Sequence, residues 1–94
     1  MAHTHVSAAI QILQTLVNKY PSVYQYQRDL AVAHQEMAIL QSDLNDLPAA
    51  RTHLQAAIDL FEELTRNAPG NQDYLKGLAG AKELMSFLPP ADGK

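Results

Sequence analysis

The stretch KYPSVYQYQRDLA at residues 19–31 returns in altered form as NAPGNQDYLKGLA at residues 67–79. In both stretches a proline is followed five residues later by Tyr-x3-Leu-Ala, and the two copies lie 48 residues apart. When residues 6–40 are laid on 54–88 at that offset, eleven of the 35 pairs are identical. A composition like this one would give roughly two or three identities by chance. Self-similarity at such a period is typical of stacked structural repeats.

Apolar residues recur at steps of three and four along the whole chain, which is the period of one face of an α-helix. In the third segment these residues are Leu47, Ala50, Leu54, Ala57, Phe61 and Leu64. No segment shows the strict alternation of a half-buried strand. The pattern predicts an all-α fold of antiparallel helical hairpins within one domain at 1–88, followed by a flexible tail at 89–94. The four helices are expected at about 4–19, 22–44, 47–67 and 72–88.

The expected breaks between helices have local causes. Pro21 and Pro69 end the preceding helices, because proline lacks the amide that a helix needs and restricts the residue before it. Ser22 and Asn71 are predicted to be N-caps of the helices that follow. Pro48 suits the first turn of the third helix, where its missing N–H costs nothing. Connections this short predict antiparallel neighbours.

Composition narrows the function classes. The 94 residues suit one small domain, with 47% hydrophobic and 18% charged residues and a net charge of −3. The seven Lys and Arg residues are scattered, so no basic stripe is available for phosphates and nucleic acid is not an expected partner. The chain has no cysteine and no apolar run of the ~18 residues that a membrane span requires. We therefore expect no membrane partner, and a cytoplasmic location is favoured.

The repeated motifs resemble the tetratricopeptide repeat, whose pattern is bulky-x2-Leu-small-x2-Tyr on one helix and Ala-x3-Phe-x7-Pro on the next. The second half is matched by Ala57, Phe61 and Pro69, and one period earlier by Ala9, Leu13 and Pro21. The first half is matched in part by Leu75, Leu78 and Ala79, and by Gln27, Leu30 and Ala31. The 48-residue period exceeds the usual 34 residues by fourteen, which is about four helical turns. Two added turns in each helix keep both apolar stripes facing inward, so the chain resembles a long-helix variant, similar to repeats of large bacterial signalling and regulatory proteins.

The resemblance implies a non-catalytic module that binds a peptide or partner helix on a concave face lined by the first helix of each pair. The candidate contact residues there are Gln25, Arg28, Gln35, Asp73, Lys76 and Glu83. Arg28 and Lys76 occupy equivalent positions in the two repeats. In the family, basic residues like these act together with asparagines one turn later to bind the C-terminal carboxylate of a peptide. Those asparagines are replaced by Val32 and Gly80, so only a preference for an acidic or extended peptide is expected. No cofactor is implied.

An alternative is a structural role. The segment 72–88 carries more apolar surface than one neighbouring helix covers, which predicts either a piece of a longer array or a homo-oligomer formed through this segment.

Catalytic and metal-binding chemistry find little support. Folding the chain about residues 45–46 places His53 opposite Ala38 and away from His34, so convergent metal ligands are not expected. The acidic cluster of Asp59, Glu62 and Glu63 is interpreted as a solvated helix face. Gly77 and Gly80 lie within a helical pattern with no flanking strand, which favours close helix approach, or a thin place in the concave wall, over a phosphate-binding loop. The sequence therefore indicates a protein that is not an enzyme.

Overall fold

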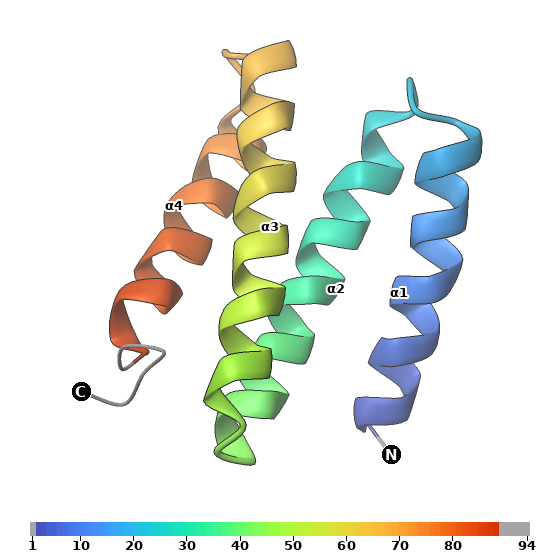
Figure 1. Ribbon diagram of the computed structural model, residues 1–94. Helices are drawn as coiled ribbons and strands as arrows, with labels where there is room; N and C mark the ends of the chain where they lie inside the picture. The colour runs from blue at the N-terminus through green and yellow to red at the C-terminus, as the bar shows by residue number, and fades with distance from the viewer. Residues whose placement is uncertain (1, 89–94) are drawn as a thin grey trace.

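The computed structural model describes residues 2–88, which form four α-helices and contain no strand (Figure 1). The helices are α1 (Ala2–Lys19), α2 (Tyr24–Asp43), α3 (Leu47–Asn67) and α4 (Gln72–Phe87). The prediction of an all-α fold with four helices is confirmed. The tail expected at 89–94 lies outside the described residues.

The helix starts follow from side chains just before them. The side chain of Asn71 accepts a hydrogen bond from the amide of Tyr74 at 3.1 Å, so Asn71 is the N-cap of α4 as expected. Asp46 caps α3 through the amide of Ala49 at 3.4 Å, and a proline occupies the first turn of that helix.

The start of α2 differs from the prediction. Ser22 is not its N-cap, because the helix begins at Tyr24 and the N-cap is Val23, whose side chain makes no capping hydrogen bond. Val23 lies 48 residues before Asn71, so the two caps are equivalent positions and only the later one carries a side-chain acceptor. The side chain of Gln27 instead donates to the carbonyl of Pro21 at 2.8 Å and ties the turn to the helix.

The helices pack in chain order, and α2 also touches α4. In Figure 1, α3 lies in front of α2 and α4, while α1 and α4 occupy opposite edges of the molecule. The contacts α1–α2 and α3–α4 are equally extensive, as the 48-residue period of the sequence would lead one to expect.

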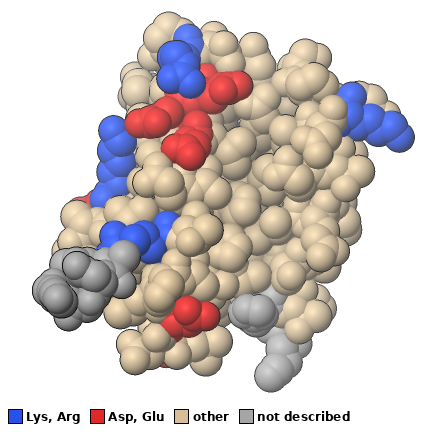
Figure 2. Space-filling view, in the orientation of Figure 1, with Lys and Arg blue, Asp and Glu red and all other residues tan. Residues whose placement is uncertain are grey.

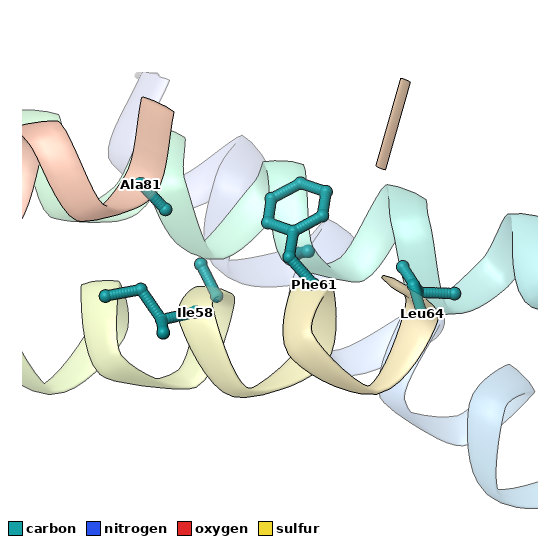
Figure 3. Close-up of a cluster of buried hydrophobic side chains, with 6 residues drawn as sticks. Ile58, Phe61, Leu64 and Ala81 are labelled. Carbon is teal, nitrogen blue, oxygen red and sulfur yellow. The ribbon is translucent and has the colours of Figure 1, made fainter. Parts of the chain in front are cut away.

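The core is centred on α3. Ile58, Phe61 and Leu64 of that helix are buried together with Ala31 of α2 and Ala81 of α4 (Figure 3). A second buried cluster lies nearer the α2–α3 turn, and its members are Ala38, Ala50 and Leu54, with Leu84, Met85 and Leu88 packed against them. Small residues at the contacts let the helices approach closely while one large side chain fills each gap.

Helix α1 is peripheral to this core. From Thr4 to Lys19 none of its residues is fully buried, and Ile12 remains 62% exposed. The helix carries no Asp or Glu, and Lys19 is its only Lys or Arg, so most of the surface over α1 in Figure 2 is uncharged.

Candidate partner-binding surface

The predicted contact residues lie along the seam between α2 and α4, and two of them bond to each other. Arg28 of α2 donates to Asp73 of α4, with Nε 3.0 Å from Oδ2 and Nη2 3.5 Å from Oδ1. Arg28 also lies 3.5 Å from the carboxylate of Asp29. The hydrogen bond to Asp73 raises the pKa of Arg28 above its usual value, although partial burial opposes it.

The other four residues are less tightly connected. Gln25 donates to Asp29 at 2.9 Å and is joined to Arg28 through that shared carboxylate. The side chain of Gln35 lies over Gly80, with Nε2 3.8 Å from where a Cβ at Gly80 would stand. Lys76 and Glu83 are both exposed on α4, and within residues 2–88 neither forms an ion pair. Lys76 is thus an exposed basic side chain three residues after Asp73 on the same helix.

At the other end of the seam lies an apolar groove that the sequence did not single out as a site. It has a volume of about 190 Å³ and is lined by Ala38, Ile39, Ser42, Asp43, Leu54, Leu84, Phe87 and Leu88. Ile39 is 46% exposed and Phe87 is 77% exposed, although both are large and apolar. The sequence marks these two residues only by the repeat, because Ile39 and Phe87 are 48 residues apart and occupy the same position in its two copies.

A second hollow of about 420 Å³ lies among α1, α2 and α3. It is lined by Val17, Asn18, Pro21, Gln27, Asp59, Leu60 and Glu63. Its one buried polar side chain, Gln27, already donates to the backbone carbonyl of Pro21.

The two interhelical histidines are closer than the sequence suggested. The prediction that His53 lies away from His34 is wrong, because their ring centroids are 5.3 Å apart. The axial offset between the two positions is about one helical turn, which two imidazole side chains can span. Nδ1 of His53 lies 2.8 Å from Oε1 of Gln41, whereas Nδ1 of His34 is buried with no hydrogen-bond partner in the described part of the chain.

The environment of His34 disfavours its charged form. Burial lowers the pKa of His34 below its ordinary value, and the nearby His53 lowers it further. In residues 2–88 no group of three or more His, Asp or Glu side chains converges as metal ligands would. The histidine pair therefore belongs to the α2–α3 packing.

Comparison of the chain with protein-family models, with curated proteins and with solved structures gives no match. Of the four helices in the described residues, none is long and apolar enough to cross a membrane.

Proposed function

We propose that the chain is a non-catalytic helical-repeat module of the tetratricopeptide type, which binds a segment of a partner protein along the α2–α4 seam. The observation that carries this proposal is the apolar groove at residues 38–43 and 84–88, where Ile39 and Phe87 remain exposed over the buried side chain of Leu54. A hydrophobic anchor inserted between exposed apolar walls is the usual centre of a peptide-binding surface.

At the opposite end of the seam, basic side chains favour a partner segment that carries an acidic residue. Arg28 and Lys76 are equivalent basic positions, and Lys76 has no ion-pair partner within residues 2–88. A carboxylate on the bound segment would bond to Lys76 and share Arg28 with Asp73. The expected ligand is an extended or helical segment with an apolar anchor at one end and an acidic residue toward the other.

Selection from a displayed library of random peptides, followed by fluorescence anisotropy on the synthesised binders, tests this proposal. Ile39→Glu in the groove is expected to weaken binding at least about tenfold, because it places an unpaired charge in an apolar contact. Lys76→Glu is expected to weaken binding of acidic peptides by a few-fold and to reduce the salt dependence of their affinity.

Ile12→Glu is the matched control, since Ile12 is also an exposed isoleucine on a helix but lies on α1, away from the seam. Peptides whose affinity is unchanged by Ile39→Glu, or a library that yields no binder, would remove the seam as the binding surface.

A further inference from the structure

The 48-residue period makes α4 the counterpart of α2. Along one face, however, the residues of α2 are more buried than their counterparts on α4. In α2 this face packs against α3: Ala31 and Ala38 are 0% and 1% exposed, and His34 contacts His53. The counterparts of Gln27, Ala31, His34 and Ala38 on α4 are Leu75, Ala79, Lys82 and Ser86, and all four are exposed. Among residues 2–88, nothing covers the face of α4 that corresponds to the α3-binding face of α2.

Helix α1, the counterpart of α3, shows the complementary difference. The residues of α3 that pack against the rest of the core include Leu54, Ala57, Phe61 and Leu64, none more than 2% exposed. Their counterparts on α1 are Val6, Ala9, Leu13 and Leu16, which are all only half-buried. Ile12, the counterpart of half-buried Leu60, is the most exposed of the large apolar side chains on this helix.

We propose that a second copy of the chain covers these faces, with α1 of one copy packing on α4 of the next as α3 packs on α2 within the chain. The chain itself supplies the template. Ala31 and Ala57 belong to one buried cluster, and their counterparts Ala79 and Ala9 are the same residue type, which permits the same close approach.

The exposed apolar side chains also come into register. Gln27 of α2 and Leu60 of α3 line the same hollow, so the template places their counterparts, Leu75 and Ile12, near each other. Leu75 is 39% exposed and Ile12 is 62% exposed, and the contact would bury both. Lys82, which lies on the covered face, is 3.8 Å from Glu62 of its own chain and would enter the interface already paired.

The arrangement of the helices permits this contact only between copies. The two helices lie at opposite edges of the molecule and do not touch each other (Figure 1). The end of α4 and the start of α1 lie at the same end of the molecule in Figure 1, as antiparallel packing of the two requires. Two different faces meet in this contact, so it is heterologous and adds further copies in open chains or a closed ring. It is independent of whether the α2–α4 seam binds a peptide.

Sedimentation velocity over protein concentrations from about 10 µM to about 1 mM tests the proposal. The average mass should rise above the 10.4 kDa of one chain and continue past that of a dimer, with a dissociation constant in the ~1 µM to ~1 mM range. Ile12→Glu and Leu75→Glu should each give monomers, because each disables one of the two faces. An equal mixture of these two variants should form dimers and nothing larger, because one intact α1 face then meets one intact α4 face.

Ile39→Glu is the matched control and should assemble as the unmodified chain does, since Ile39 lies on neither face. Circular dichroism checks that each variant retains its helices. A strict monomer over the whole range would overturn the proposal, and so would a mixture of the two variants that fails to dimerise. Loss of assembly in Leu75→Glu with full assembly in Ile12→Glu would instead show an α4–α4 contact.

Discussion

Gly77 lies where α4 packs closely on the ring of Phe61 from α3. A Cβ built at this position would overlap the ring of Phe61, with Cδ1 at 2.9 Å and two further ring atoms closer still. The ring of Phe61 is 2% exposed and fills the space that a side chain at residue 77 would need. Gly80, three residues later, has room for a methyl group, because the nearest atom to a Cβ there, Nε2 of Gln35, would lie at 3.8 Å.

The two glycines should therefore respond in opposite directions to alanine. Gly80→Ala is expected to raise the free energy of unfolding by about 0.5–1 kcal/mol, because alanine restricts the unfolded chain and favours the helix. In Gly77→Ala the same gain is outweighed by overpacking, which typically costs about 1–3 kcal/mol. Urea denaturation followed by circular dichroism measures both. Equal stabilisation by the two substitutions would mean that Phe61 moves aside at no cost.

At the scale of the elements, the α2–α3 hairpin combines a turn set by local chemistry with an interface that local chemistry does not reveal. Asn45 has a φ of 62°, in the left-handed region that asparagine tolerates better than most residues, and Asp46 then caps α3. These two residues identify the turn in the sequence. The approach of His34 to His53 depends instead on how the two helices are rotated and offset along their axes.

The histidine contact predicts a pH dependence of stability. In the unfolded chain His34 titrates near its ordinary pKa of about 6.5, whereas burial holds the folded pKa lower. Below pH ~6.5 the unfolded state thus binds more protons than the folded state. The free energy of unfolding therefore decreases as the pH is lowered, until the pH is below the folded pKa. Above pH ~6.5 this contribution is fully present and constant. The slope for one group is at most about 1.4 kcal/mol per pH unit.

Urea midpoints measured between pH 7.5 and pH 5, values that span the ordinary histidine range, give this slope. His34→Leu should flatten the profile, because it removes the titrating group and the buried nitrogen that lacks a partner. His5→Gln is the control, since His5 is exposed on α1 and its replacement should leave the slope unchanged. A profile that keeps its full slope in His34→Leu would assign the pH dependence to other groups.

On the scale of the whole molecule, the four helices differ in how much of their surface is buried against other helices. Helix α3 contacts both α2 and α4 and contributes six buried residues, whereas α1 packs on α2 alone and has none from Thr4 onward. Local opening requires less free energy where fewer apolar contacts must be broken.

Amide hydrogen exchange at low protein concentration should therefore show α1 at least about tenfold less protected than α3, which corresponds to a difference of about 1.4 kcal/mol. Hydrogen–deuterium exchange followed by mass spectrometry of peptides or by NMR measures this difference in protection directly. Protection of α1 that rises with protein concentration would agree with head-to-tail packing onto α4. Equal protection of α1 and α3 at every concentration would show instead that the four helices open as one unit.

The sequence by itself determined the all-α class and the positions of the four helices. Helical period, prolines and caps act over a few neighbouring residues, so they can be read locally; the one misplaced cap, Ser22, was an error of a single position beside Val23. The tertiary structure decided which side chains meet. The Arg28–Asp73 pair, the His34–His53 contact and the groove between Ile39 and Phe87 all join different helices. Such contacts depend on the rotation and axial offset of packed helices, which the interlocking of the whole core fixes and no single segment encodes.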